Sequence, residues 1–211
     1  MRTVDDDRWG AVRGRLSGLP GGTGVNIAYE AIDRHVDAGH GADAAIRFLA
    51  KSDPPEAAGD VYTYERLARE TSAFAAALRG LGVQPGERVF LLAGRVPRAY
   101  VAVLGALRGR FVACPLFSAF GPDPIEQRMV LGDAAVLVTT GALFRRKVAA
   151  MLDRLPVRHT ILLDVDDQAL APDGTLAYMG AIDNAPMGRV PESGLVNYVS
   201  EALVDLEAGR A

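Results

Sequence analysis

The segment VFLLAGRVPRAYVAVLGALRGRFVACPL, residues 89–116, joins two apolar runs through a stretch of helix length. Two similar runs follow, and the four recur roughly every 23–25 residues: VFLLA (89–93), FVACPL (111–116), AVLVT (135–139) and HTILL (159–163). Within each run the apolar residues are continuous and do not alternate with polar ones. This pattern is typical of strands that are covered on both faces, and it predicts a parallel sheet.

Helical spacing of apolar residues fills the intervals between these runs. It predicts helices at 97–107, 123–131 and 142–155, and a further helix at 65–81 before the first run. Gly82 follows that first helix, and glycine is common just beyond a helix C-terminus. One helix per interval is the connection that parallel strands require. The sequence therefore predicts a doubly wound α/β fold with a mostly parallel sheet and flanking helices.

The rest of the chain divides by composition into three parts. Residues 1–24 are polar and end in a glycine-rich connector, which predicts a flexible N-terminal segment. Residues 25–165 form the predicted α/β domain, beginning with a helix that Asn26 caps and a short strand at 44–49. Residues 166–211 are predicted to be an irregular tail ending in an amphipathic helix. The apolar stripe of that helix is a candidate surface for a protein partner: Leu195, Val199, Leu203 and Leu206.

Composition excludes several classes of protein. The chain has 211 residues, is 49% hydrophobic and 23% charged, and has a formal net charge of −3. This slightly acidic balance argues against nucleic-acid binding through bulk positive charge. The longest strongly apolar run, 99–107, is too short to cross a bilayer, so no membrane association is expected. A single cysteine, Cys114, and an N-terminus without an apolar leader predict a cytoplasmic location.

Three patterns that suggest chemistry are better explained as ordinary structure. The glycines at 18–24 have no strand before them and no lysine among them, unlike a phosphate-binding loop. His35, Asp37 and His40 do not supply a metal site, because histidines five residues apart do not share a helix face. His159 lies in an apolar run, where histidine is usually structural. We therefore expect no catalytic residue and no metal site in this chain.

Two loops are more distinctive. Residues 117–128, FSAFGPDPIEQR, follow a predicted buried strand and open a helix, which is where open α/β sheets bind ligands. Arg145, Arg146 and Lys147 begin the helical region one strand further on, where cations oppose the helix dipole unless an anion is bound. The two loops could flank one polyanionic ligand. An ordinary loop and a solvated basic face explain the same residues, and spacing alone leaves both interpretations open.

Four segments together resemble the N-terminal part of the AMP-forming acetyl-CoA synthetases. They are NIAYEAIDRH (26–35), YTYERL (62–67), LGVQPGERV (81–89) and CPLFSAFGPD (114–123). The resemblance covers about residues 19–164 and places the chain in the wider superfamily of adenylate-forming enzymes. It implies the fold of their N-terminal subdomain. It also implies a two-step ligase, in which ATP activates a carboxylate as an acyl-adenylate and the thiol of CoA then displaces AMP.

The resemblance also implies where CoA would bind. In acetyl-CoA synthetases the loop that matches Phe117, Ser118 and Ala119 lines the site for the CoA nucleotide, and the arginine that matches Arg145 contacts a CoA phosphate. A second family arginine falls at Val148, so this sequence departs from the family there. The neighbouring Arg146 or Lys147 is a hypothetical substitute for it.

The family's ATP-binding motifs do not occur in this sequence. The phosphate loop ending in Lys-Pro-Lys-Gly, the aromatic-Thr-Glu motif, the ribose-binding aspartate and the adenylation lysine all lack a counterpart, and Lys51 and Lys147 are the two lysines. ATP and magnesium binding are therefore not expected, whereas CoA binding is retained as a hypothesis. We expect a truncated, acetyl-CoA synthetase-like protein that cannot adenylate a carboxylate alone. Two alternatives are a regulatory module that binds CoA or another nucleotide, and one chain of a split acyl-CoA ligase.

Overall fold

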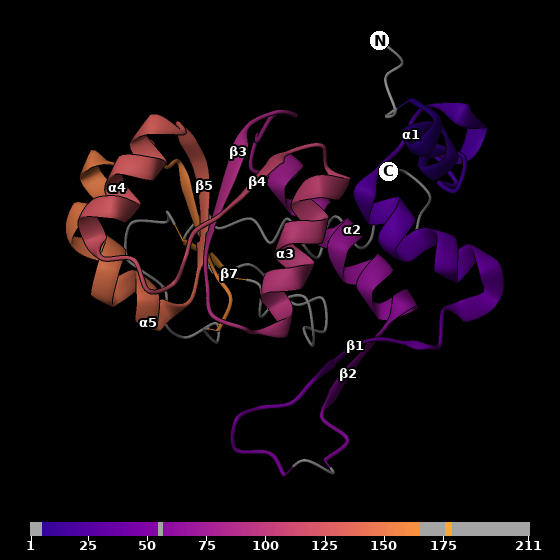
Figure 1. Ribbon diagram of the computed structural model, residues 1–211. Helices are drawn as coiled ribbons and strands as arrows, with labels where there is room; N and C mark the ends of the chain where they lie inside the picture. Colours follow the sequence, from indigo (N-terminus) through magenta and orange to yellow (C-terminus); the bar gives the residue numbers. More distant parts are fainter. Residues whose placement is uncertain (1–5, 55–56, 165–175, 179–211) are drawn as a thin grey trace. The chain divides into compact units, whose positions relative to one another are not determined.

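The computed structural model describes residues 6–54, 57–164 and 176–178 (Figure 1). The chain divides into two compact units, Met1–Ala68 and Arg69–Ala211, and the boundary lies inside helix α2, Tyr64–Gly80. The domain limits expected at 24/25 and 165/166 stay predictions. The amphipathic helix predicted around Leu195–Leu206 lies outside the described residues. No helix in the described part of the chain is both long and apolar enough to span a membrane.

The first unit consists of short helices and a β-hairpin. The helices are α1 Asp6–Arg13, η1 Pro20–Gly22, η2 Tyr29–Asp33 and η3 Val36–His40. Asn26 caps the helical region as predicted, since its Oδ1 accepts from the N–H groups of Ala28 at 2.9 Å and Tyr29 at 3.3 Å. The predicted strand at 44–49 is present as β1, Ala44–Phe48. It pairs antiparallel with β2, Asp60–Thr63, a pairing that the sequence did not predict.

The N-terminal connector contains more local structure than its composition predicts. Helix α1 occupies part of the segment that was expected to be flexible. The Glu30 carboxylate accepts from the N–H groups of Ser17 at 3.1 Å and Gly18 at 2.7 Å, and these bonds hold the end of the connector against η2. Together with Arg34 at 3.0 Å they lower the pKa of Glu30 below its usual value.

The second unit contains a five-stranded sheet in which every neighbouring pair is parallel. Its strands run in the order β4-β3-β5-β6-β7. Their bounds are β3 Arg88–Leu92, β4 Val112–Pro115, β5 Ala134–Thr139, β6 His159–Leu162 and β7 Leu176–Tyr178. The predicted doubly wound α/β fold is thus confirmed. The difference is β7, which lies in a segment expected to be irregular.

Helices cover both faces of this sheet. Figure 1 shows α4, Pro122–Leu131, and the short α5, Gly141–Leu143, on one face, and α3, Pro97–Arg108, on the other. The region predicted as one helix, 142–155, is three helical segments: α5, the wide π turn η4 Phe144–Val148, and the tighter η5 Ala149–Arg154. Val148 breaks the helical geometry between the last two, with φ −120° and ψ −40°.

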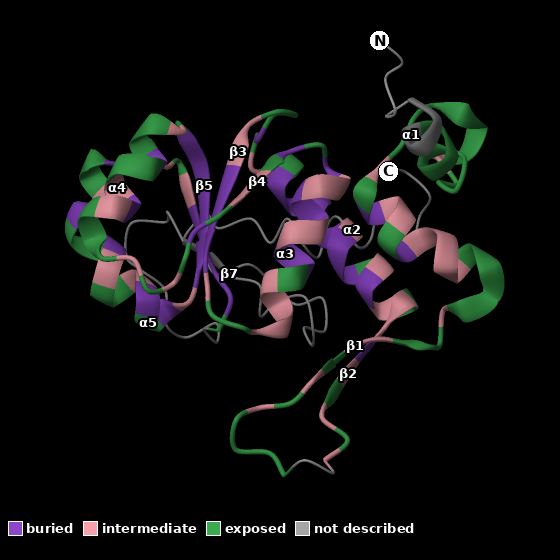
Figure 2. Cartoon of the chain, viewed as in Figure 1, coloured by how far each residue is buried: buried purple, intermediate pink, exposed green. Residues whose placement is uncertain are grey.

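The apolar runs form the core because the sheet is covered on both faces. All six residues of the central strand β5 are buried (Figure 2). Burying a large apolar side chain contributes about 1.5–3 kcal/mol, so this strand and the helices packed on it dominate the stability of the unit. One continuous cluster joins strands β3, β4 and β5 to α4 and the segments 141–155; its largest fully buried members are Leu92, Ile125, Met129, Leu137 and Met151.

Three helices of the second unit end in a left-handed residue, but a glycine occupies that position in just one of them. After α2 the left-handed residue is Gly82, φ 76°, as the sequence suggested. After α3 and α4 it is Arg110, φ 64°, and Asp133, φ 47°, although each follows a glycine. Gly109 and Gly132 are instead needed because a side chain at either position would clash with a phenylalanine ring. A Cβ on Gly109 would lie 2.3 Å from the Phe111 ring, and one on Gly132 would lie 2.6 Å from the Phe90 ring.

Candidate functional site

The strand order locates the edge of the sheet where a ligand site is expected. The chain leaves β3 for β4 on one side of it and then returns to β5 on the other side. The order therefore reverses between β3 and β5, and ligands of open α/β sheets bind at the carboxyl ends of strands beside such a reversal. The loops at this edge follow β3, β4 and β5. We call them the 93–96 loop, the 116–121 loop and the 140–147 segment.

The 116–121 loop presents an aromatic ring to solvent. Its first residue, Leu116, is buried and donates its N–H to the Leu91 carbonyl at 2.7 Å, which fixes the loop to β3. Phe117 is 65% exposed, an unusual fraction for a side chain of its size. Its ring meets the Phe120 ring edge-on at a centroid distance of 5.6 Å. The Arg128 guanidinium lies 4.3 Å from the centre of the Phe120 ring, so Phe120 is held between two neighbours.

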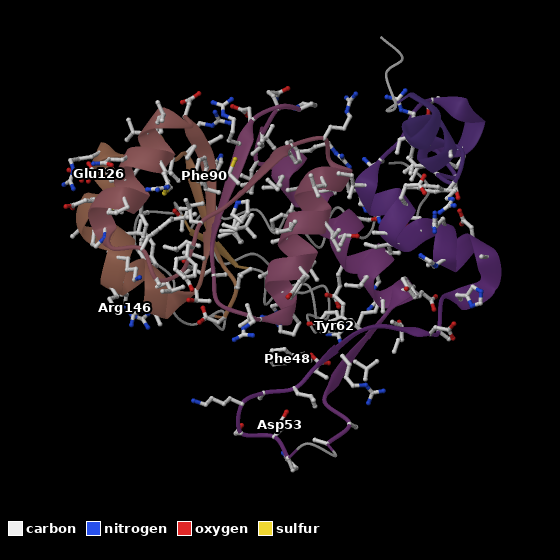
Figure 3. All side chains as sticks on the ribbon, viewed as in Figure 1. Phe48, Asp53, Tyr62, Phe90, Glu126 and Arg146 are labelled. Carbon is white, nitrogen blue, oxygen red and sulfur yellow. The ribbon has the colours of Figure 1, made fainter. Side chains whose placement is uncertain are left out.

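The 140–147 segment begins with an ordered helix start. The Thr140 hydroxyl accepts from the Leu143 N–H at 3.4 Å, and the Asp164 carboxylate accepts from the Gly141 N–H at 2.6 Å. These contacts satisfy N–H groups that a helix leaves free at its start. Arg145 and Arg146 follow on the outside of the wide η4 turn, and both are exposed. Figure 3 shows Arg146 extending outward from this turn.

Lys147 joins the two loops that the sequence singled out. Its Nζ donates to the Ser118 carbonyl at 2.7 Å and to the Phe120 carbonyl at 2.6 Å. The 116–121 loop and the 140–147 segment are therefore adjacent. Lys147, like Arg146, is a hypothetical substitute for the family's second arginine, but its ammonium group binds backbone carbonyls here. No local sequence pattern indicates a contact between residues that are 27–29 positions apart.

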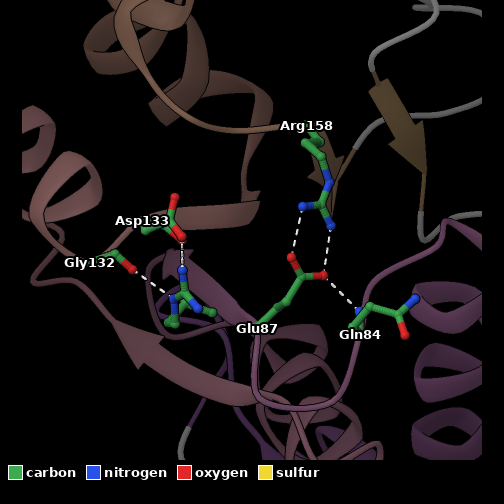
Figure 4. Close-up of polar contacts among 6 residues, drawn as sticks. Gln84, Glu87, Gly132, Asp133 and Arg158 are labelled. Atoms are coloured by element: carbon green, nitrogen blue, oxygen red, sulfur yellow. Dashed lines mark hydrogen bonds and ion pairs between the residues drawn. The ribbon is translucent and has the colours of Figure 1, made fainter.

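The charges at this edge differ from those at the opposite, amino end of the sheet. At the amino end Arg158 and Glu87 form a two-bond ion pair at 2.7 Å, and Arg88 pairs with Asp133 and with the Gly132 carbonyl (Figure 4). At the carboxyl end three exposed arginines form no hydrogen bond or ion pair within the described residues: Arg95, Arg145 and Arg146. Unpaired guanidinium groups favour an anionic ligand. Arg95 was not predicted from the sequence, and its signal is its position in the loop that follows a buried strand.

The other residues of the predicted site present no charged or aromatic side chain to a ligand. Ser118 is half-buried and contributes its carbonyl to Lys147, whereas Ala119 is exposed. Val148, at the position of the family's second arginine, is fully buried in the core and cannot contact a ligand. Burial raises the pKa of the nearby Cys114 thiol, which keeps it protonated and weakly nucleophilic at neutral pH.

The histidines have structural partners. The His35 ring stacks on the Tyr64 ring at 4.5 Å, and His40 Nδ1 lies 2.9 Å from Asp43 Oδ2. Asp37 instead accepts from the Tyr29 hydroxyl at 2.9 Å, so these three residues do not converge. Burial and the neighbouring Arg158 charge lower the pKa of His159 in β6. Among the described residues no group of three His, Cys, Asp or Glu side chains is arranged to hold a metal ion.

This fold is that of a known class. The family model described as "AMP-binding enzyme" matches residues 33–186, which is well over half of the chain. The chain belongs to the AMP-binding enzyme family. Sequence relatives include the acetyl-coenzyme A synthetase of Streptomyces avermitilis, 38% identical over 122 residues, which cover 58% of this chain and 18% of the relative. The acetyl-coenzyme A synthetase of Bacillus subtilis is 35% identical over 142 residues, covering 66% of this chain and 23% of the relative.

Solved structures agree on the fold. A Brucella canis acyl-CoA synthetase superposes with a TM-score of 0.59 and 25% identity, covering 90% of this chain and 29% of that one. A benzoate CoA ligase from Burkholderia xenovorans has a TM-score of 0.56 at 24% identity, covering 66% of this chain and 26% of that one. The resemblance stated from sequence is confirmed. The chain spans about one fifth of the length of these two acetyl-coenzyme A synthetases.

Proposed function

We propose that this acyl-CoA synthetase-like chain binds CoA, or another phosphorylated adenine nucleotide, at the carboxyl edge of its sheet. We propose also that these 211 residues do not adenylate a carboxylate by themselves. The proposal rests on one observation: an exposed aromatic ring, Phe117, lies on a loop that Lys147 joins to a segment with two exposed guanidinium groups. These groups, of Arg145 and Arg146, form no hydrogen bond or ion pair with any other described residue.

An exposed aromatic ring beside exposed guanidinium groups can bind both parts of a nucleotide, the base and the phosphates. An aromatic side chain stacks on a purine ring with about 1–3 kcal/mol per base. Guanidinium groups bind phosphate through paired, charge-assisted hydrogen bonds. CoA carries three phosphates and an adenine, so it can use both kinds of contact. The family match supports CoA over other anions, because the acetyl-coenzyme A synthetases that resemble this chain are named for that cofactor.

The proposed absence of adenylation follows from the donors that the reaction needs. Phosphoryl chemistry requires donors and cations aimed at the charge that develops on the phosphate. The chain has two lysines: Lys51 is exposed in the first unit, and the Lys147 ammonium is bound to carbonyls. Neither lies in a phosphate loop of the kind that the family uses.

We expect calorimetry to detect saturable CoA binding and to resolve the two arginines. Arg145→Ala and Arg146→Ala are each expected to weaken binding about fivefold, because each removes one charged contact to phosphate. Dephospho-CoA, which lacks the 3′-phosphate, tests whether the two arginines contact that group. If they do, dephospho-CoA binds the parent chain more weakly than CoA does, and its affinity does not fall further in either variant. Arg79→Ala, an exposed arginine at the end of α2, is the matched control and is expected to bind CoA like the parent chain. No heat of binding at millimolar CoA would refute the proposal.

We expect no acetate-dependent exchange of pyrophosphate into ATP with the purified chain. The reason is the missing stabilisation of charge on the α-phosphate during adenylation. The measurement is isotope exchange against a blank, with one of the acetyl-coenzyme A synthetase relatives as the positive control. Exchange that clearly exceeds the blank and depends on acetate would show that this chain does catalyse adenylation.

A second candidate function is one chain of a split acyl-CoA ligase, because these residues match the family but contain no counterpart of its phosphate loop. In that case a separate polypeptide would carry the phosphate loop. Acetate-dependent exchange that appears only when this chain is mixed with the complementary part of a relative would support it. We further propose a cytoplasmic location, a compartment that the single cysteine, Cys114, favours.

A further inference from the structure

Lys147 occupies an unusual position for a lysine. It is half-buried, and its ammonium group donates hydrogen bonds to two backbone carbonyls of another loop, Ser118 at 2.7 Å and Phe120 at 2.6 Å. A carbonyl pair neutralises less of an ammonium charge than a carboxylate does. The contact therefore orders the loop without cancelling the positive potential of the segment that carries Arg145 and Arg146.

The wide turn η4 explains how a lysine reaches this place. Leu143 and Val148 are both buried in the core cluster, although they are five residues apart. In a regular α-helix core contacts recur every three or four residues, whereas a π turn accommodates one more residue. The three basic residues between these anchors thus avoid the core. Arg145 and Arg146 are exposed, and Lys147 reaches the neighbouring loop.

The loop that Lys147 holds is the one that carries the exposed ring. Phe117 and Phe120 contact each other edge-on, and the Phe120 N–H donates to the Phe117 carbonyl at 3.0 Å, so the loop is a compact turn. Lys147 binds carbonyls within and at the end of that turn. Fixing the turn before a ligand arrives removes the entropic cost of ordering it on binding.

We propose that Lys147 is a positioning residue, whose ammonium group holds the 116–121 loop in the conformation that presents Phe117 to a nucleotide. This inference rests on the proposed function for the identity of the ligand, but not for the ordering of the loop. It differs from the hypothesis that Lys147 contacts a ligand phosphate in place of the family's second arginine.

Lys147→Met tests this proposal, because methionine keeps the apolar stem and removes the donors. Without ligand, amide hydrogen exchange of Phe120, whose N–H donates to the Phe117 carbonyl, is expected to accelerate at least tenfold, while exchange in the buried strand β5 stays unchanged. CoA affinity is expected to fall about tenfold, and Lys147→Arg, which keeps donors, to recover part of it. Lys51→Met, at an exposed lysine of the first unit, is the control and is expected to change neither quantity.

The salt dependence of CoA binding separates positioning from direct contact. Replacing a lysine that only positions the loop reduces the slope of log Kd against log salt concentration less than Arg145→Ala does, because its charge acts on the phosphates from a distance. Loss of a direct phosphate contact reduces the slope as much as Arg145→Ala does. Unchanged exchange of the Phe120 amide in Lys147→Met, or a slope reduced as much as in Arg145→Ala, would overturn the proposal. If the parent chain does not bind CoA but exchange accelerates in the variant, the positioning of the loop stands and the proposed function fails.

Discussion

Replacing Gly105 with alanine is expected to lower the free energy of unfolding by about 2 kcal/mol. Gly105 is buried on α3 where α2 passes, and an added Cβ would lie 2.9 Å from the Thr71 carbonyl oxygen and 2.8 Å from Phe74 Cδ1. Overpacking costs about 1–3 kcal/mol, and more where a backbone atom must move. Alanine recovers about 1 kcal/mol of helix propensity, which is too little to offset the clash.

Chemical denaturation of the parent and variant chains measures this effect. Gly94→Ala is the matched control, because a Cβ there would meet no atom within 4 Å. The control is expected to change stability by less than about 0.5 kcal/mol. Equal stabilities of the two variants would mean that α2 and α3 do not approach as closely as the structure shows. The hydrogen bond from Arg108 Nε to Thr71 Oγ1, at 3.1 Å, spans the same contact and limits how far the helices can separate.

Glu87 is expected to make the second unit sensitive to acid. Its carboxylate accepts two hydrogen bonds from Arg158 and one from the Gln84 N–H, each at 2.7 Å (Figure 4). These contacts hold its pKa at about 2, below the usual 4.5. Because folding lowers this pKa, the unfolded chain takes up the proton first as the pH falls. The stabilisation is therefore complete above about pH 5.5 and is lost progressively from about pH 4.5 to about pH 2.

Glu87→Gln is expected to cost about 1.5 kcal/mol of stability at pH 7, a value that allows for screening of the exposed side of the pair. The difference between parent and variant is expected to shrink steadily as the pH is lowered from 5.5 to 2.5. Denaturant titrations across that range measure it. Asp153→Asn serves as control, since exposed Asp153 forms no ion pair or hydrogen bond within the described residues. A stability difference that stays constant with pH would contradict the assignment to Glu87.

The secondary structure of the second unit was predictable because its signals are local. Four continuous apolar runs became β3, β4, β5 and β6, with ends within one or two residues of those expected. Gly82 ended α2 in the left-handed conformation, as its position indicated. Each of these features depends on residues within a few positions of one another, so composition and spacing are sufficient to reveal them.

The helix ends at Gly109 and Gly132 show where local signals fail. Either glycine is the obvious candidate for the left-handed position, yet Arg110 and Asp133 take it. Phe111 and Phe90 pack where the missing Cβ atoms would be, and burying an aromatic ring outweighs about 1–2 kcal/mol of backbone strain. The same holds for the predicted helix 142–155, which divides at η4 because Leu143 and Val148 must both reach the core.

The candidate site was predictable in part. The sequence alone determined strands β1 and β3 to β6, most helices, the family, and the residues of two loops that flank one edge, because these depend on neighbouring residues and on recognisable motifs. The tertiary structure alone decided that the strand order reverses between β3 and β5, that Arg95 shares their edge, and that Lys147 binds the carbonyls of Ser118 and Phe120. These contacts join residues far apart in the chain. They exist because packing of the shared core brings the strand ends together, and no local pattern encodes that packing.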